Sequence, residues 1–405
     1  MNHSIHTKRT VPTELSVWAY PWDIADEGAA TALDWLKQHH FSAIDLCPNY
    51  HAIATYSARN PHRTQFYSEQ GSVYFHPQLP RYGRIRPKVH DESAVLDVYG
   101  EVATAASNRD MRLNAWVIGM FQPWIARTYP DTAIENAFGD RSYAATCPAH
   151  PDVRAYLSNL LCDLCDQFPI DNITLENVGY PEFTYGWVRP RILVYMSPWA
   201  SFLSGLCFNE HSMSAARAHG VDPEHIRGIV ARELRDYLNH PLMPGADDPP
   251  ISELVAERCD HNEDFRGYLE ARDQAAAGTV KTVRHALRGH NVRLGISGAS
   301  PGWAMDGLRL QDLLHTINAL MIADPTDEAE TANKQIQTVR AASTDIQITI
   351  NQTAHYDTDP HGPGFVARAD RIASIHPDRV MVYNFGLVPA ATLAHTGSIL
   401  HERLN

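Results

Sequence analysis

The sequence predicts a (β/α)8 TIM barrel, because short apolar runs alternate with helical stretches along most of the chain. Each apolar run ends in a polar tip, and the 405 residues hold eight such units. One barrel with one large insertion accounts for this length without a second core. We therefore expect a single catalytic domain over residues 1–405, with a helical insertion over residues 183–289 after the fourth strand.

The strands follow in order from the apolar runs and the residues that end them. Pro48 breaks the run after the second strand. Pro151 suits the first turn of the helix before the fourth strand, where a missing N–H costs nothing. The alternation stops at about residue 183 and resumes at Asn291. The predicted strands cover Leu15–Tyr20, Phe41–Leu46, Arg112–Ile118, Asn172–Leu175, Asn291–Ser297, Ala319–Ala323, Asp345–Ile350 and Arg379–Tyr383.

Helical stretches separate these strands, and an open doubly wound sheet is the rival architecture. That sheet would need a Gly-rich phosphate turn after the first strand, and Ala19-Tyr-Pro-Trp-Asp23 contains no glycine. The barrel is therefore favoured. The predicted helices outside the insertion cover Gly28–His39, Glu92–Arg109, Pro151–Phe168, Thr326–Ser343 and Val366–His376.

Composition and charge narrow the choice of partners. The net charge is −13 and the arginines are scattered, which argues against nucleic acid, since phosphate binding needs clustered basic residues. The sequence contains no run of about 18 apolar residues, so no membrane span is predicted. The polar N-terminus, Met1–Thr10, does not resemble a signal peptide, so we expect a cytoplasmic protein. The expected partner is a small-molecule or oligosaccharide substrate. The oligomeric state stays open, a homo-oligomer included.

Cysteine and histidine patterns indicate no metal or cofactor. Cys162 and Cys165 form the only tight cysteine pair, and they fall within a predicted helix without a second such pair. Buried cysteines on a helix face are a better reading than a zinc ribbon. The 22 histidines include no pair spaced i, i+4 around a glutamate, so we expect no dedicated zinc or iron site.

Side chains just past the C-terminal ends of barrel strands converge on one site. These tips hold carboxylates, amides and aromatic rings, which is the mixture that a carbohydrate site needs for hydroxyl groups and apolar ring faces. The long loop after the second strand, residues 49–90, adds further aromatic and histidine side chains. The expected substrate-binding residues are Tyr20, Trp22, Asp23, His51, His76, Trp116, Asn177, Asn351, Gln352, His355, Tyr383 and Asn384.

Glu176 is the first catalytic candidate, because it follows the fourth predicted strand directly. A carboxyl group in a crowded cleft loses solvation, which raises its pKa and suits it to general acid catalysis. The alternative is a structural glutamate paired with an arginine across the barrel mouth.

Asp45 and Asp324 are the candidates for a second carboxylate, at the ends of the second and sixth strands. Either could instead cap a helix. For Asp324 the cap is favoured, because Pro325-Thr-Asp-Glu328 is typical of a helix start. No helix follows Asp45 at once. Asp23 could cap a helix or line the pocket.

Four segments carry a resemblance to a known family: Tyr74-Phe75-His76-Pro77, the stretches 136–140 and 147–156, and Ile173-Thr-Leu-Glu-Asn177. Here the chain resembles glycoside-hydrolase-like TIM barrels, including uncharacterised bacterial members. The resemblance implies a glycosidase-type acid/base carboxylate after the fourth strand, at Glu176. Many retaining members carry Asn-Glu there and a nucleophilic Glu after strand seven, where this chain has Asn351 and Gln352. An inverting pair, with carboxylates about 6.5–9.5 Å apart, therefore stays open.

Three functions follow as hypotheses. The first is a glycoside hydrolase acting on a saccharide or glycoside by carboxylate acid/base catalysis. The second is another carbohydrate-active enzyme, a sugar isomerase, epimerase or lyase, which a divalent metal held by Glu176, Asp324 and a histidine would favour. The third is a noncatalytic sugar-binding barrel, because a fold does not fix a function.

Overall fold

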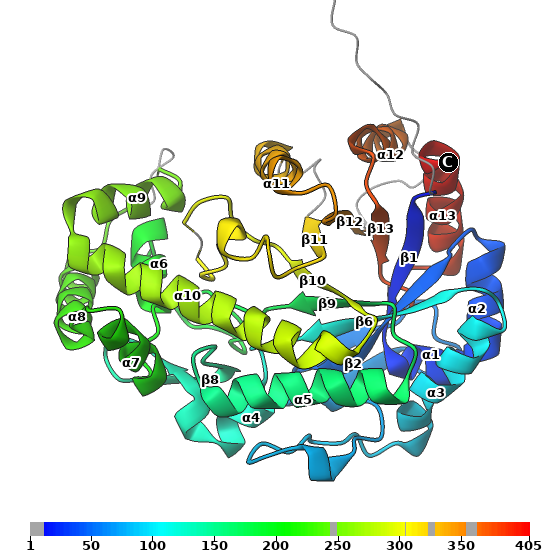
Figure 1. Cartoon of the computed structure of the whole chain (residues 1–405), viewed down its shortest axis with the longest axis horizontal. Coiled ribbons are helices and arrows are strands. Elements are labelled where there is room, and N and C mark those ends of the chain that lie inside the picture. Colours follow the sequence, from blue (N-terminus) through cyan, green and yellow to red (C-terminus); the bar gives the residue numbers. More distant parts are fainter. Residues whose placement is uncertain (1–11, 244–248, 304, 323–328, 354–362) are drawn as a thin grey trace, which may run out of the picture.

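Eight parallel strands close into a barrel in the structure, a computed structural model that describes residues 12–243, 249–303, 305–322, 329–353 and 363–405. Each strand pairs with the next along the chain, and β1 pairs with both β2 and β13, which closes the ring (Figure 1). This confirms the predicted (β/α)8 barrel. The barrel strands are β1 (Glu14–Ala19), β2 (Ala43–Tyr50), β6 (Arg112–Ile118), β9 (Asn172–Glu176), β10 (Arg293–Ser297), β11 (Ala319–Ile322), β12 (Gln347–Thr353) and β13 (Arg379–Tyr383).

The second strand is longer than predicted. Pro48 was expected to end it, but β2 continues to Tyr50, and its pairing with β6 shifts register between Leu46 and Asn49. A proline lacks the N–H of a regular ladder, and such an irregularity in the pairing accommodates it. The strand therefore ends at Tyr50 and not near Asp45. Its last residues pair antiparallel with the short strand β5 (Ser72–Val73).

Helices follow most strands, as predicted, and two short helices were not expected. α1 (Pro21–Glu27) begins directly after β1, and α4 (Pro123–Thr128) follows β6; both have proline in the first turn. Two antiparallel hairpins extend the loops, β3 (Ile53–Tyr56) with β4 (Gln65–Ser68) and β7 (Ala133–Glu135) with β8 (Arg141–Thr146). The other helices around the barrel are α2 (Ala29–Gln38), α3 (Ser93–Ser107), α5 (Pro151–Gln167), α11 (Ala329–Ala342), α12 (Pro363–Ile375) and α13 (Ala390–Leu404).

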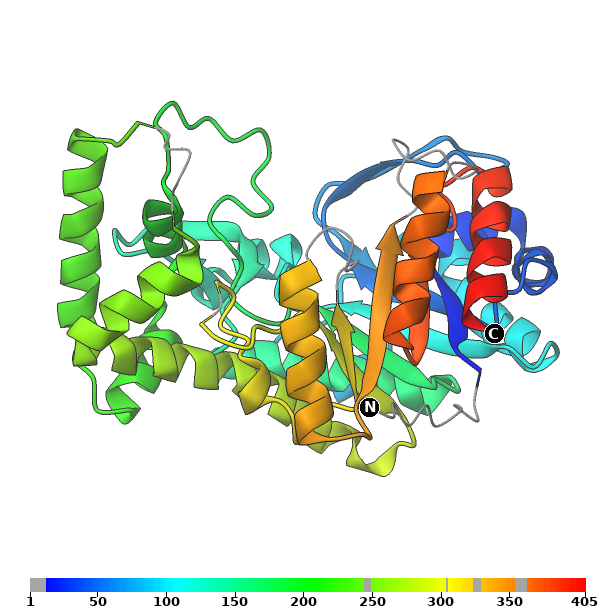
Figure 2. The ribbon, with the colours of Figure 1, turned by 90° about the horizontal axis from the view of Figure 1, so that it is seen from above.

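Among the described residues between β9 and β10 lie five helices: α6 (Pro198–Gly205), α7 (Glu210–Ala218), α8 (Pro223–Asn239), α9 (Ile251–His261) and α10 (Glu263–Ala286). They share an apolar core of their own, which includes Phe202, Leu234 and Phe265. Figures 1 and 2 show α6–α9 gathered on one side of the molecule, while α10 runs back along α5 towards β10. Short 3-10 turns complete the list: Leu79–Arg81, Pro130–Thr132, Leu287–Gly289 and Leu310–Asp312.

The barrel interior divides into a polar end and an aromatic end. Alternate residues of a strand face the interior. Arg379 on β13 forms ion pairs with Glu14 on β1 and with Asp45 on β2, near the N-terminal ends of the strands. Towards the C-terminal ends, Trp18 and Trp116 pack edge to face with centroids 4.0 Å apart. Side chains at the C-terminal mouth of the barrel therefore lie above a layer of packed aromatic rings. In the described part of the chain, no helix is long and apolar enough to cross a membrane.

Candidate active site

Glu176 is the last residue of β9 and lies at the barrel mouth. The indole Nε1 of Trp116 donates a hydrogen bond to its Oε2, and the Asn177 side-chain amide donates one of 3.2 Å to its Oε1. Burial raises the pKa of Glu176, and the two hydrogen bonds lower it by less. Within the described residues, no ion pair joins Glu176 to a basic side chain. The alternative interpretation, in which Glu176 is a structural residue paired with an arginine, is therefore not supported by the described residues.

Three tyrosine hydroxyls lie beside this carboxylate. The Tyr20 hydroxyl is 3.2 Å from that of Tyr50 and 2.8 Å from that of Tyr383. The negative charge of Glu176 contributes to a raised pKa of both Tyr50 and Tyr383, which places it close to their hydroxyls. Burial is the main cause of the raised pKa of all three tyrosines. They stay protonated at neutral pH and can donate hydrogen bonds.

A cavity of about 270 Å³ opens in front of Glu176, and Asp306 lines it as well. Asp306 lies in the loop after β10, and its Oδ1 accepts a hydrogen bond of 3.0 Å from the Leu308 backbone. Burial is the main cause that raises its pKa. Gly179 lines the same cavity and packs against this loop, because a Cβ atom there would come within 2.4 Å of the Asp306 carbonyl oxygen. The site thus brings together two carboxyl groups, each with a raised pKa.

Helix α10 holds the loop that carries Asp306. The Arg272 guanidinium on α10 donates to the Met305 carbonyl and lies 4.8 Å from the Tyr180 ring centroid. Arg309, just past Asp306, forms an ion pair of 3.1 Å with Asp273 of the same helix. Because α10 lies far from Asp306 in sequence, only the tertiary structure reveals this support.

The strand-tip prediction identified part of this site. The prediction was that side chains at the C-terminal strand ends converge, and around Glu176 lie four of the predicted residues: Trp116, Asn177, Tyr20 and Tyr383. It missed Asp306, Tyr50 and Tyr185, whose hydroxyl accepts a hydrogen bond of 3.0 Å from Asn177. Tyr50 was missed because β2 was ended too early. For Asp306 the one available signal was the turn-forming pair Asp306-Gly307, where Gly307 has a φ of +76°.

Asp45 does not belong to the site. It is fully buried inside the barrel, where its carboxylate pairs with Arg379 near the N-terminal end of the interior. It was placed at a tip only because the second strand was predicted to end near it. His76 is also outside the site, because its exposed ring pairs at 2.8 Å with Asp97 on α3.

Several other predicted binding residues are buried near the mouth without contacting Glu176. Trp22 is fully buried and stacks between Tyr20 and Phe66 at centroid distances of 4.4 and 3.8 Å. Asp23 lies within α1 and accepts a hydrogen bond from Asn60, and burial raises its pKa to about 6. Gln352 and Asn384 are fully buried, and Asn351 is half-buried. Asp324 and His355 lie outside the described residues.

His51 lies between two aromatic rings next to the site. Its ring centroid is 4.1 Å from that of Tyr50 and 4.3 Å from that of Phe121, and its Nδ1–H donates to the Ala52 carbonyl at 2.6 Å. Burial lowers the pKa of His51 to about 4. The ring is therefore neutral at physiological pH.

This depressed pKa predicts a stability loss in acid. An unfolded histidine has a pKa of about 6.5, so the unfolded state binds more protons between about pH 6.5 and about pH 4. Stability should fall across this window, by about 3 kcal/mol from His51 alone. Urea unfolding of the wild type and of His51→Phe at both ends of the window checks this. Phenylalanine keeps an aromatic ring at this position but cannot bind a proton. The carboxylates are the same in both proteins, so an equal loss of stability in acid in both would contradict the prediction.

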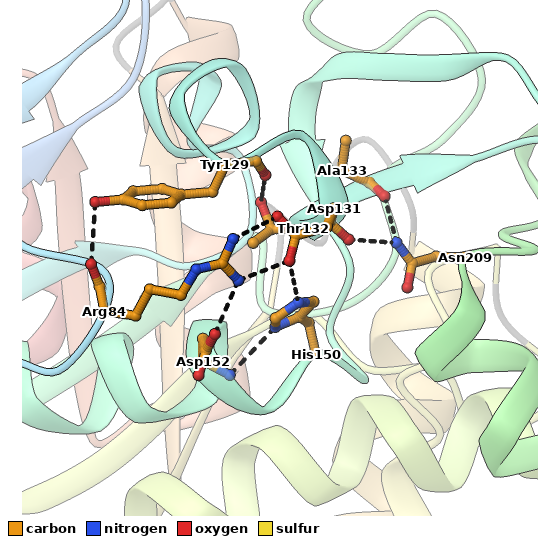
Figure 3. A network of polar contacts seen from close by, with 8 residues as sticks. All are labelled: Arg84, Tyr129, Asp131, Thr132, Ala133, His150, Asp152 and Asn209. Carbon is orange, nitrogen blue, oxygen red and sulfur yellow. Dashed lines mark hydrogen bonds and ion pairs between the residues drawn. The ribbon is translucent and has the colours of Figure 1, made fainter.

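A polar network fixes the β7–β8 hairpin beside the mouth (Figure 3). The Arg84 guanidinium donates to both oxygens of Asp131, at 2.6 and 2.7 Å, and to Asp152 at the start of α5. Asn209, the N-cap of α7, donates to the Asp131 and Ala133 carbonyls at 2.8 Å. One network thus joins the loop after β2, the hairpin, α5 and α7.

The described residues contain no group of three or more His, Cys, Asp or Glu side chains that could hold a metal ion. All six cysteines are free thiols, and the predicted pair Cys162 and Cys165 lies on α5, partly packed against the core. The expectation of no metal or cofactor stays a prediction.

Comparison with known proteins relates this fold to glycoside hydrolases. No family model matches the chain, and no curated protein sequence matches it. Among solved structures, it is similar to α-L-fucosidase isoenzyme 2 from Paenibacillus thiaminolyticus, with 12% identity and a TM-score of 0.56 over 97% of this chain and 49% of that chain. It is also similar to the glycoside hydrolase domain of PgaB (BpsB) from Bordetella bronchiseptica, with 13% identity and a TM-score of 0.55 over 96% and 99%.

A third similar structure is the β-galactosidase from the psychrophilic Marinomonas ef1, with 10% identity and a TM-score of 0.56. The match covers 96% of this chain and 59% of that chain, so the chain spans about half to three fifths of the fucosidase and the galactosidase. At these identities the likeness establishes the fold. The resemblance to glycoside-hydrolase barrels is therefore confirmed for the architecture.

Proposed function

We propose that this protein hydrolyses glycosidic bonds, with Glu176 as the proton donor. The observation that carries the proposal is that Glu176 and Asp306 line one cavity at the C-terminal mouth of the barrel. Burial raises the pKa of Glu176, which favours the protonated form that a general acid needs. The similarity of the fold to glycosidases supports the same reaction class.

The roles follow from the contacts. Glu176 would donate its proton to the leaving-group oxygen as the glycosidic bond breaks. The Trp116 and Asn177 N–H groups would then stabilise the carboxylate that forms. Asp306 would act as the second carboxylate, activating water or attacking the anomeric carbon. The hydroxyls of Tyr50 and Tyr383 would hydrogen-bond the sugar.

A panel of 4-nitrophenyl α- and β-glycosides tests the reaction class, with nitrophenol release as the readout. Hydrolysis of at least one member supports the proposal when the matching alkyl glycoside, with its poorer leaving group, loses much more activity in Glu176→Gln. Tight saccharide binding without turnover would favour a noncatalytic sugar-binding barrel. Stoichiometric divalent metal in the purified protein, together with sugar isomerisation, would favour an isomerase or epimerase.

Asp306→Asn should lower kcat by about 10²-fold or more, because the amide cannot act as base or nucleophile. Stability should change little, since the amide oxygen can still accept the hydrogen bond from the Leu308 backbone. Sodium azide should restore part of the activity on an activated glycoside by replacing the missing nucleophile.

Asp312→Asn is the matched control, because Asp312 lies in the same loop and pairs with Arg309 at 3.0 Å. It should keep wild-type kcat. If both variants lose activity equally, loop disorder explains the loss and Asp306 is not the second carboxylate.

A further inference from the structure

A second, larger pocket adjoins the cavity of Glu176. It has a volume of about 540 Å³ and lies between the β7–β8 hairpin and residues 181–188, with the end of α6 as its third wall. Pro181 and Tyr185 line both hollows, so the two are contiguous. Such a volume falls within the range of ligand sites, about 300–1,000 Å³. The reaction assigned to Glu176 leaves this space unexplained.

Three exposed aromatic side chains line this pocket. Trp187 is 44% exposed, Tyr143 is 42% exposed and Tyr185 is 38% exposed, although large aromatic side chains usually bury most of their surface. Each of two rings is held by an edge-to-face neighbour: Tyr185 by Phe121 at 4.9 Å and Trp187 by Phe183 at 5.2 Å. The rings are thus fixed in place before any ligand arrives, which lowers the entropy cost of binding.

The backbone next to these rings is tightly packed and held by turn hydrogen bonds. Gly186 has a φ of +75°, and a Cβ atom there would come within 2.3 Å of the Phe121 ring. The Tyr185 and Trp187 N–H groups donate to the carbonyls of Glu182 and Thr184, at 3.0 and 2.9 Å. Residues 182–187 therefore form compact turns that present two aromatic rings to the pocket.

Polar side chains lie between the rings. Asn136, Arg127 and Glu182 line the pocket and offer donors and acceptors for hydroxyl groups. Aromatic faces with interspersed amides and charges suit a chain of sugar rings, whose apolar faces stack while their hydroxyls hydrogen-bond. The hairpin wall is tied to the barrel through Arg84 and Asp131, so it is rigid enough to set a register for such a chain.

We propose that this pocket binds the further sugar units of an oligosaccharide whose bond is cleaved at Glu176. The inference rests on the proposed function for the site, and it names the substrate class as oligosaccharides and not simple glycosides. Trp187 and Tyr143 supply the stacking surfaces, and Tyr185 marks the passage from the cavity into the pocket.

The test compares binding with turnover. Binding of hexasaccharides of the cello-, xylo-, manno-, malto- and chito-series to Glu176→Gln is measured by calorimetry, with and without Trp187→Ala. For a hexasaccharide that binds, Trp187→Ala should raise Kd by about tenfold, because the substitution removes an aromatic contact surface. Trp187→Tyr keeps an aromatic face and should raise it less. Tyr67→Ala, at an aromatic residue that is 73% exposed and does not line this pocket, should leave Kd unchanged.

Turnover then separates this inference from the proposed function. In the otherwise wild-type protein, Trp187→Ala should lower kcat/KM for that hexasaccharide about tenfold and leave hydrolysis of the matching 4-nitrophenyl monoglycoside unchanged. Unchanged hexasaccharide Kd and kcat/KM in Trp187→Ala would overturn the inference, and so would the absence of any hexasaccharide binding. Absence of hydrolysis alongside Trp187-dependent binding would instead refute only the proposed reaction.

Discussion

Glu176→Gln should lower kcat for a glycoside with a poor leaving group by about 10²–10⁴-fold, the usual contribution of general acid catalysis. The amide keeps the size of the side chain and an oxygen that can accept the Trp116 N–H, but it has no proton to transfer. KM should therefore stay close to the wild-type value.

The comparison of leaving groups makes this prediction specific. A 4-nitrophenyl leaving group needs little protonation, so its cleavage should suffer much less than that of an alkyl glycoside. Rates for both substrates and melting temperatures should be measured on the same variant. An equal loss on both substrates, together with a lowered melting temperature, would assign Glu176 a structural role.

Arg379→Met should destabilise the protein by about 3–5 kcal/mol, the usual cost of removing one partner from a buried ion pair. Arg379 is 3% exposed and is paired with Glu14 at 2.8 Å and with Asp45. The variant leaves the buried Asp45 without its cation, whereas Glu14 keeps an ion pair with Arg112. Burial raises the pKa of Asp45, and the charge of Arg379 opposes that rise. Without Arg379, Asp45 should take up a proton at higher pH. Denaturant unfolding measures the loss.

Two further variants give the contrast. Arg217→Met removes an exposed pair with Glu210 and Glu224 on the surface, and stability should hardly change. Asp45→Asn should lower stability while leaving kcat near the wild-type value. If Asp45→Asn instead abolished activity in a fully stable protein, Asp45 would return to the catalytic site despite its depth in the barrel.

The architecture could be predicted from sequence because a parallel barrel repeats one local pattern. All eight predicted strands occur in the structure, since each is a short buried run bounded by turn residues. Glu176, Trp116 and Asn177 could be placed for the same reason, as residues at the ends of regular strands. The early end assigned to the second strand shows the limit, because proline is a strong break signal that an irregular pairing can override.

Contacts between distant segments decided the rest of the site. Asp306 lies in an irregular loop whose path depends on two contacts with α10, the Met305 carbonyl with Arg272 and Arg309 with Asp273. No local periodicity encodes that docking. The depth of Asp45 in the barrel depends on the register in which β2 pairs with β1 and β6. A residue near the N-terminal end of a strand lies in the polar interior, whereas a residue at its C-terminal end lies at the mouth. The sequence by itself determined the barrel and the carboxylate that ends its fourth strand. The tertiary structure decided which other carboxyl group lines the same cavity, because burial and charge pairing arise only when the strands and helices pack.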